Sequence, residues 1–274
     1  MIKTNFREGS STMENAAVIM QVNNGIATIT LNEPNSLNAL SGAIIEKLNH
    51  FFNSIKNDSS IRAVILTGNG RSFCAGGDIK GFSKVTSAAS GRKYMQKHSY
   101  FLKELVNMEK PVIAAVNGFA IGAGFSIAIA CDIVIASSKA KFGLSFNKVG
   151  LVPDLGALYH LPRIVGMARA KELAFSDRIL SASEAKDYGI CLEVVEEDHL
   201  LNFCTELADS FVANPPIAIG LTKTMLNHSM ESSLEDILKE EAMVQGIVFN
   251  TQDHQEGVRA FIDKTKPNFT GSYQ

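Results

Sequence analysis

The stretch that decides the fold is VIAAVNGFAIGAGFSIAIACDIVIAS, which occupies residues 112–137. It opens with the apolar run 112–116, which is typical of a buried strand. An Asn-Gly turn follows, and then a run of small residues that favours a helix from about 123 to 131. A second strand is expected at 132–137. A strand, a helix and a further strand in succession predict an α/β core with a largely parallel sheet.

The same alternation continues on both sides of this stretch. Before it, the patterns predict a strand hairpin, a helix with Ser41 as N-cap, a buried strand and a helix that stops before Pro111, at residues 17–22, 26–31, 41–58, 63–68 and 90–109. After it, they predict a short capped helix, a strand and four more helices, at 181–189, 190–195, 199–212, 216–228, 234–248 and 253–264. We therefore expect an α/β core at 15–200, a helical region at 201–274 and a disordered lead at 1–14.

Composition excludes several classes of protein. The chain has 274 residues, of which 46% are apolar and 20% charged, with a formal net charge of −2. That length suits one large domain with a full core. Lysine and arginine are scattered, without the basic stripe that nucleic-acid binding requires. The longest apolar run is interrupted by Asn117, glycines and Asp132, so no membrane association is expected.

The cysteines and the first residues indicate the compartment. Cys74, Cys131, Cys191 and Cys204 form no Cys-x-x-Cys pair and have no histidine at metal-ligand spacing. Reduced thiols and no bound metal are expected. The first residues lack the apolar segment of a signal peptide. Together these features predict a cytoplasmic protein.

Two glycine loops are the first candidates for chemistry. SFCAGGD (72–78) and NGFAIGAG (117–124) each follow a predicted strand. Backbone N–H groups at a helix start have no intrahelical partner and carry the positive end of the helix dipole. Two such loops side by side could place two donors on one oxygen, as in an oxyanion hole. The alternative, that both are ordinary strand-to-helix turns, stays open on the residues alone.

Two other interpretations of the second loop have little support. A dinucleotide fingerprint would need a small residue where Ile127 stands, and an acidic residue at ribose-binding distance, which is missing. A nucleophile elbow could be built around Ser126, with Asp154 and His254 as partners. Ser126, however, would lie inside a helix rather than on the strained turn that such a nucleophile requires.

At this point the sequence resembles a known family. The segments that carry the resemblance to the crotonase, or enoyl-CoA hydratase/isomerase, superfamily are NGFAIGAGFSIAIACDIVIASSKAKFG (117–143), SFCAGGDI (72–79), LNEPNSLNAL (31–40), the segment 150–190 and FIDKTKPNFTG (261–271). They occur in the order typical of that family and cover about residues 15 to 271. The resemblance implies an α/β fold of the crotonase type, a spiral of ββα units, whose C-terminal helices take part in trimerisation.

The resemblance also implies a site. The family binds acyl-CoA thioesters and holds the thioester oxygen with two backbone N–H groups, which by position are those of Gly77 and Ala123. Coenzyme A is carried as part of the substrate, and no separate cofactor is implied. Further positions that match substrate-binding residues are Leu37, Ala39, Ala75, Asp78, Ile79, Phe146 and Lys264. Lys264 would meet a CoA phosphate; the alternative is a solvated charge at a helix end.

Two positions depart from the family's hydratases, which use two glutamates to add water across a double bond. Ser126 and Phe146 stand at those positions here. Serine is a poor base unaided, and phenylalanine transfers no proton. Efficient hydration by that mechanism is therefore not expected.

Asp154, in GLVPDLG, matches a carboxylate that another subset of the family uses. That subset comprises peroxisomal-type Δ3,Δ2-enoyl-CoA isomerases and the ring-epoxide isomerases of phenylacetate breakdown. Phe146, Leu151 and Leu155 would desolvate Asp154, raise its pKa and make it a better base. A dehalogenase branch uses such an aspartate as a nucleophile with a histidine, for which His98 is the candidate. The plain alternative is a helix N-cap in a Pro-Asp-x-Gly turn.

The sequence therefore predicts an acyl-CoA isomerase that shifts a double bond, or rearranges a ring epoxide, with Asp154 as acid and base. The alternatives are an enoyl-CoA hydratase with an unidentified second group, and a non-catalytic acyl-CoA-binding relative. The acyl group, and with it the choice between fatty acid metabolism and phenylacetate catabolism, stays open. A homotrimer or a hexamer built from two trimers is expected by resemblance.

Overall fold

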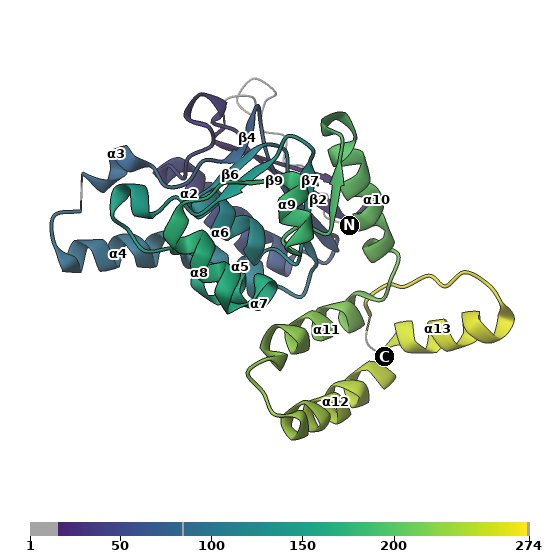
Figure 1. The fold of residues 1–274 in the computed structure, drawn as a ribbon. Helices are drawn as coiled ribbons and strands as arrows, with labels where there is room; N and C mark the ends of the chain where they lie inside the picture. Colours follow the sequence, from purple (N-terminus) through teal and green to yellow (C-terminus); the bar gives the residue numbers. More distant parts are fainter. Residues whose placement is uncertain (1–15, 84, 273–274) are drawn as a thin grey trace.

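A six-stranded sheet forms one layer of the molecule (Figure 1). The computed structural model describes residues 16–83 and 85–272, so the expected lead at 1–14 lies outside the described residues. The strands follow the order β1-β2-β3-β5-β7-β10, with bounds Val18–Asn23, Ile26–Leu31, Ala63–Gly68, Val112–Val116, Ile133–Ser137 and Glu193–Val195. All neighbouring strands in this sheet are parallel except the hairpin of β1 and β2. The predicted α/β core with a largely parallel sheet is confirmed.

A second sheet of four short strands lies beside the first. Its order is β4-β6-β8-β9, with bounds Ser72–Cys74, Phe119–Ile121, Lys141–Gly143 and Leu180–Ser181. Along the chain, β3 and β4, β5 and β6, and β7 and β8 form successive pairs. The first strand of each pair joins the large sheet and the second joins the small one. This repetition is the spiral of ββα units that the resemblance implies.

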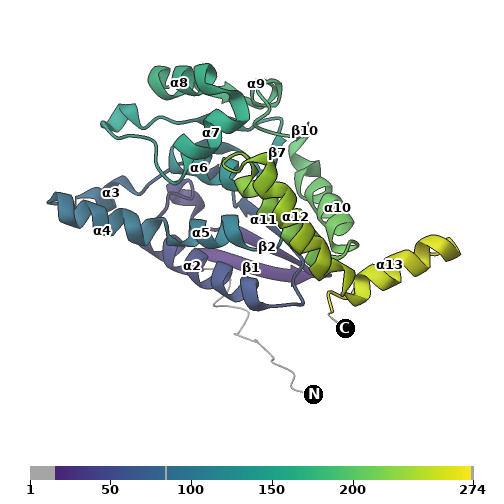
Figure 2. The ribbon, with the colours of Figure 1, turned by 90° about the horizontal axis from the view of Figure 1, so that it is seen from below.

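Both faces of the large sheet are buried, which explains its continuous apolar strands. Val64 and Leu66 of β3 face one hydrophobic cluster, whereas Ala63 and Ile65 face another. The first cluster includes α2 (Gly42–Asn57), α5 (Tyr100–Asn107) and α6 (Ala123–Ala130). The second is closed by α10 (Leu200–Val212), on the opposite side of the sheet (Figure 2).

The predicted helix at 90–109 is two helices. α4 (Ala88–His98) ends at Ser99, and α5 begins at Tyr100. α4 has no fully buried residue, whereas α5 buries Phe101, Leu102 and Leu105. The prediction of a single helix was wrong because α4 lies at the surface whereas α5 packs on the core. No proline or glycine at Ser99 marks the break. The N-cap predicted at Ser41 is confirmed: its hydroxyl accepts a hydrogen bond from the Ile44 N–H at 3.2 Å.

The remaining helices connect the sheets and form the C-terminal region. α3, α7, α8 and α9 span Ile79–Phe82, Ala157–Val165, Met167–Ser176 and Ala182–Asp187; α11, α12 and α13 span Pro216–Ser229, Leu234–Phe249 and Gln252–Asp263. Single 3₁₀ turns lie at Pro34–Ser36, Asn147–Val149 and Glu197–His199. Among the described residues, no helix is both long and apolar enough to cross a membrane.

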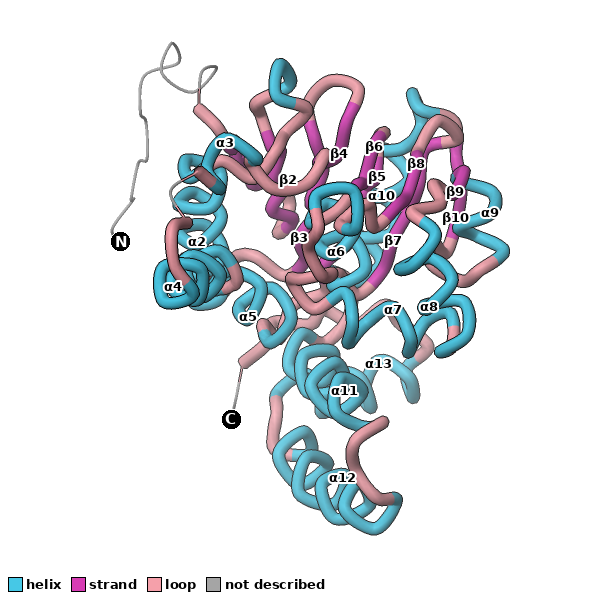
Figure 3. The backbone as a smooth tube through the Cα atoms, turned by 60° about the vertical axis from the view of Figure 1, so that its left-hand side comes forward, coloured by secondary structure: helices cyan, strands magenta, loops and turns pink. Residues whose placement is uncertain are grey.

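The last two helices, α12 and α13, stand apart from the α/β core (Figures 1 and 3). α10 packs on the large sheet and α11 buries Gly220 and Lys223, so the part that stands apart begins with α12. Lys223 joins α11 to the core: its ammonium lies 2.7 Å from the Asp132 carboxylate and donates to the Lys110 carbonyl at 3.0 Å. The role of the region in trimerisation stays a prediction.

Candidate active site

The two glycine loops predicted to carry chemistry are in contact. A Cβ atom at Gly124 would lie 2.0 Å from the Cys74 carbonyl oxygen, so helix α6 approaches strand β4 more closely than any larger residue allows. Gly122 adopts φ +56 and ψ −125 directly before α6, a conformation that only glycine takes readily. A Cβ atom there would lie 3.6 Å from Gly76 Cα in the other loop.

In each loop at least one backbone N–H group has no acceptor among the described residues. Ala123 is the first residue of α6, where N–H groups have no intrahelical partner. Among the described residues, neither the Ala123 N–H nor the Gly77 N–H has a hydrogen-bond acceptor, whereas the adjacent Gly76 carbonyl accepts from Leu40 at 2.8 Å. Gly77 and Ala123 line one cavity of about 260 Å³. Two free donors on one cavity are the requirement for holding a thioester oxygen.

The cavity is mainly apolar, with a few polar side chains. Its lining comes from the first glycine loop, helices α3 and α4, the start of α6 and the loop 144–155. The apolar side chains include Leu40, Phe82, Met95, Ile121, Leu144, Phe146, Val149, Leu151 and Leu155; the polar ones are Tyr94, Ser145, His98, Lys148 and Asp154. Pockets of this composition are typical of small-molecule sites.

Asp154 has the environment that the sequence predicts. Phe146, Leu151 and Leu155 line the same cavity, and burial raises the pKa of the Asp154 carboxyl to about 6. Its Oδ1 atom is buried and has no hydrogen-bond partner among the described residues. A carboxyl group in this state is closer to an effective base at neutral pH than an ordinary aspartate.

The N-cap alternative for Asp154 is wrong. The N-cap of α7 is Gly156, and no side chain caps that helix. Asp154 contributes only its carbonyl to the turn, which accepts from the Ala157 N–H at 3.0 Å. Leu155 and Gly156 have φ +47 and +78, so the turn is built from two left-handed residues rather than from a capping side chain.

Tyr94 and His98 are also brought into the cavity by helix α4. Their rings stack at a centroid distance of 3.7 Å, and His98 Nδ1 lies 2.8 Å from the Tyr94 carbonyl oxygen. That bond assigns the proton to Nδ1 and leaves a lone pair on Nε2. Burial lowers the pKa of His98, so the ring is neutral near pH 7. Burial, and then the carboxylates of Asp78 and Asp154, raise the pKa of Tyr94.

The sequence named His98 but missed Tyr94 and Ser145. The spacing of Tyr94 and His98, four residues apart on a helix, places both on one face and could have found the pair. Nothing in the pattern around Ser145 distinguishes it from other loop residues.

The other expected residues divide into two groups. Ala75, Ile79 and Phe146 line the cavity, together with the three catalytic candidates Gly77, Ala123 and Asp154. Leu37, Ala39, Asp78 and Lys264 do not line it. Leu37 lies beside the first glycine loop, because its carbonyl accepts a hydrogen bond from the Ala75 N–H at 3.0 Å. Buried Asn38 fixes that loop by donating to the Ser72 carbonyl at 2.7 Å.

Lys264 lies far from the cavity within one chain. It ends helix α13, which stands apart from the core (Figure 1). The Lys264 side chain is exposed. A contact with a CoA phosphate across a subunit boundary stays a prediction.

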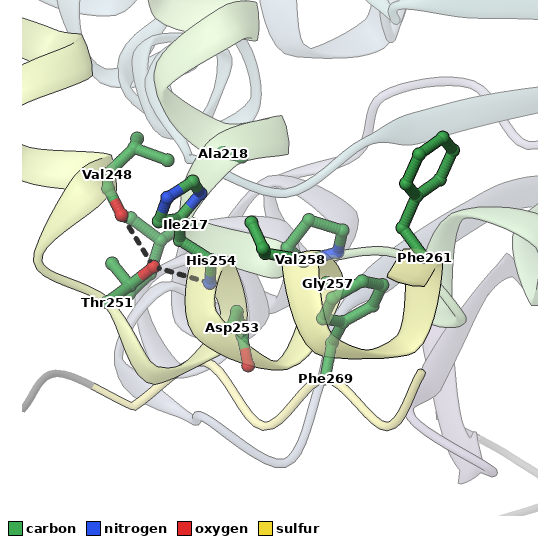
Figure 4. A pocket seen from close by; sticks show the side chains of 11 residues that line it. Ile217, Ala218, Val248, Thr251, Asp253, His254, Gly257, Val258, Phe261 and Phe269 are labelled. Carbon is green, nitrogen blue, oxygen red and sulfur yellow. Dashed lines mark hydrogen bonds between the residues drawn. The ribbon is translucent and has the colours of Figure 1, made fainter. Parts of the chain in front are cut away.

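Ser126 takes no part in the cavity. It is fully buried, and its hydroxyl is 3.3 Å from the Gly122 carbonyl oxygen, one helical turn back. His254 lines a different pocket, between α11 and α13 (Figure 4). The serine-hydrolase interpretation is therefore wrong, because Ser126, Asp154 and His254 are not brought together.

Comparison with known proteins identifies the family. Residues 21–272 match the family model described as "Enoyl-CoA hydratase/isomerase". The chain belongs to this family. The solved structure of an enoyl-CoA hydratase from Bacillus anthracis matches with a TM-score of 0.89 at 33% identity, covering 93% of this chain and 100% of that one. The crotonase fold expected from the motifs is confirmed.

Relatives in the enoyl-CoA hydratase/isomerase family include proteins named as hydratases and a protein named as an isomerase. A short-chain-enoyl-CoA hydratase of Clostridium acetobutylicum is 40% identical over 93% of this chain and 97% of its own length. A 1,2-epoxyphenylacetyl-CoA isomerase of Escherichia coli is 36% identical over 93% of this chain and 98% of its own length. Membership of the family is therefore compatible with either activity, and the choice between hydratase and isomerase must be argued from the residues of the cavity.

Proposed function

We propose that this member of the enoyl-CoA hydratase/isomerase family is an acyl-CoA isomerase with Asp154 as acid and base. The observation that carries the proposal is a single carboxyl group in an apolar cavity, its pKa raised by burial to about 6. The positions that resemble the two hydratase glutamates hold Ser126, which is outside the cavity lining, and Phe146, which has no proton to transfer.

The reaction needs one base that gives its proton back. The Gly77 and Ala123 N–H groups hold the thioester oxygen, which gains negative charge as a proton leaves the neighbouring carbon. Asp154 takes that proton as a carboxylate and returns it to another carbon of the acyl chain. The double bond moves, and the carboxylate is restored. In a ring epoxide the same site would rearrange the carbon–oxygen framework.

His98 supports a second candidate, hydration. Its neutral ring shares the cavity with Asp154 and carries a lone pair on Nε2. A neutral imidazole can activate a water molecule while a protonated carboxyl group supplies the proton for the other carbon. The hydratases among the relatives are consistent with this candidate. It would give the hydratase alternative the second group that it lacked in the sequence.

One assay separates the two candidates. Purified protein is mixed with 3-hexenoyl-CoA, and formation of 2-hexenoyl-CoA is followed by absorbance, with hydration of 2-hexenoyl-CoA measured alongside. We expect isomerisation without comparable hydration, and loss of turnover with retained CoA-ester binding in Asp154→Asn. Turnover that survives in Asp154→Asn would contradict the mechanism. Hydration that depends on His98 would favour the second candidate, and binding without either activity would favour the non-catalytic one.

Substrate, assembly and compartment belong to the same proposal. An acyl-CoA thioester is the proposed substrate, and a homotrimer or a hexamer the proposed assembly. A cytoplasmic location stays an expectation.

A further inference from the structure

We infer that Ser145 and Asp154 form a subsite for an oxygen atom on the acyl group of the substrate, close to the reacting carbons. The inference rests on the proposed function only in taking an acyl-CoA ester as the ligand. It assigns a binding role to Ser145, and it names the class of acyl group as oxygenated, with a hydroxyl or an epoxide oxygen.

Two unsatisfied polar atoms carry the inference. Ser145 Oγ and Asp154 Oδ1 are each buried and have no hydrogen-bond partner among the described residues. Both residues line the same cavity. Burying a polar atom without a partner costs about 1–3 kcal/mol, so native proteins keep few of them. A ligand that supplies the missing partners removes that cost.

The backbone at Ser145 is a second, independent observation. Ser145 has φ +49, a left-handed conformation that costs a residue with a Cβ atom about 1–2 kcal/mol. The next residue fixes the loop, because the Phe146 carbonyl accepts from both the Val149 and Leu151 N–H groups at 3.1 Å. Such strain is retained where the surroundings enforce it, and it is concentrated at functional sites. Glycine would relieve it, yet the position holds a hydroxyl.

The surrounding wall determines which ligand fits. Leu144, Phe146 and Leu155 line the cavity beside these two residues. A plain hydrocarbon chain would leave the hydroxyl and the carboxylate unpartnered. A substrate hydroxyl can accept from the Ser145 O–H and donate to the Asp154 carboxylate. An epoxide oxygen can accept from the Ser145 O–H and from Asp154 when it is protonated. A water molecule can make the same hydrogen bonds to Ser145 and Asp154, and it is the ligand that competes with the substrate oxygen.

Binding measurements test the subsite without turnover. Dissociation constants for 3-hydroxybutyryl-CoA and butyryl-CoA are measured by calorimetry with wild-type protein, Ser145→Ala and Ser145→Gly. The wild type should prefer the hydroxylated ester. Both variants should lose about 3–10-fold of that preference, as expected for one hydrogen bond, while butyryl-CoA binds within about twofold of wild type. Ser145→Gly relieves the backbone strain, so agreement between the two variants assigns the loss to the hydroxyl.

Ser126→Ala is the matched control, because it removes a buried hydroxyl outside the cavity lining and should leave the preference unchanged. Equal weakening of both esters in the Ser145 variants would overturn the inference and make Ser145 a loop-shaping residue. No preference in the wild type would also overturn it and assign the polar pair to a water molecule. A preference that disappears in the variants, in a protein that fails to isomerise 3-hexenoyl-CoA, would support the subsite while contradicting the proposed isomerase. Failure of the wild type to bind either ester would overturn both.

Discussion

The Asp154 carboxyl is partly buried, which disfavours its charged form and raises its pKa. The pH dependence of turnover should report this raised pKa. Burial raises the pKa of this carboxyl from its ordinary 3.8 to about 6. A base acts in its deprotonated form, so kcat/KM should rise about tenfold per pH unit below 6 and level off above it. The measurement is the pH profile of kcat/KM for 3-hexenoyl-CoA between pH 4.5 and 8. A profile that is already flat from pH 5 upward would show that Asp154 is not the titrating base.

The same burial predicts that Asp154 lowers the stability of the fold. A carboxyl whose pKa is raised in the folded state favours folding below its unfolded pKa, and that contribution is lost as pH rises through about 6. At pH 8, Asp154→Asn should therefore have a free energy of unfolding about 1–2 kcal/mol larger than that of wild type, after allowance for partial exposure. It should accordingly unfold at a higher temperature. The gap should narrow as pH falls toward 4.5. Thermal unfolding at both pH values checks this, and a gap independent of pH would contradict it.

The residues of the site were not equally predictable. The raised pKa of Asp154 could be predicted, because its apolar neighbours Phe146, Leu151 and Leu155 lie close to it in the sequence. The subsite role of Ser145 could not, because it depends on a left-handed φ and on a missing hydrogen-bond partner, which only the folded chain determines. Tyr94 enters the cavity through the placement of a whole helix.

At the scale of elements, the contact between α6 and β4 holds the two glycine loops together. Gly124→Ala would place a Cβ atom 2.0 Å from the Cys74 carbonyl oxygen, and the helix would have to move. We expect a loss of about 3 kcal/mol or more of unfolding free energy, together with weaker turnover, because overpacking at backbone atoms cannot be relieved by a side-chain rotation. Denaturant unfolding and kcat measure the two effects.

Gly246→Ala is the matched control for that substitution. Gly246 also lies inside a helix, α12, but a Cβ atom there would meet nothing within 4 Å. Replacing such a glycine should stabilise the protein by about 0.5–1 kcal/mol. Equal effects of the two substitutions would contradict the close approach of α6 to β4.

Predictability followed the clarity of the apolar pattern rather than length, since helices α7 and α8 were not predicted. The hairpin, the large-sheet strands at 63–68 and 112–116 and the C-terminal helices follow from clear apolar patterns and lie within a few residues of their predicted bounds. β4 and β6 were hidden in the glycine loops, because strands of three residues show no periodicity. The break at Ser99 has no local signal, since it results from packing α5 on the core while α4 remains on the surface.

At the scale of the whole molecule, the C-terminal helices expose more apolar surface than a lone chain would favour. Met230, Leu234 and Phe261 are exposed by 70%, 74% and 87%, on or beside helices that stand apart from the core. Large apolar side chains exposed to this extent are typical of interaction surfaces when they gather in one region. The surface is the direct reason, beside the family resemblance, to expect that several copies of the chain associate.

Phe261→Ser combined with Ile262→Ser tests this expectation, because both side chains are more than two-thirds exposed at the end of α13. Wild-type protein should elute at three or six chain masses in size-exclusion chromatography with light scattering. The double variant should shift toward one chain mass while its circular dichroism is retained, since neither residue belongs to the core. Gln255→Ala, an exposed polar change on the same helix, should leave the mass unchanged. A wild-type protein that elutes as a single chain would contradict the assembly, and it would leave Lys264 without a neighbouring subunit whose bound CoA it could contact.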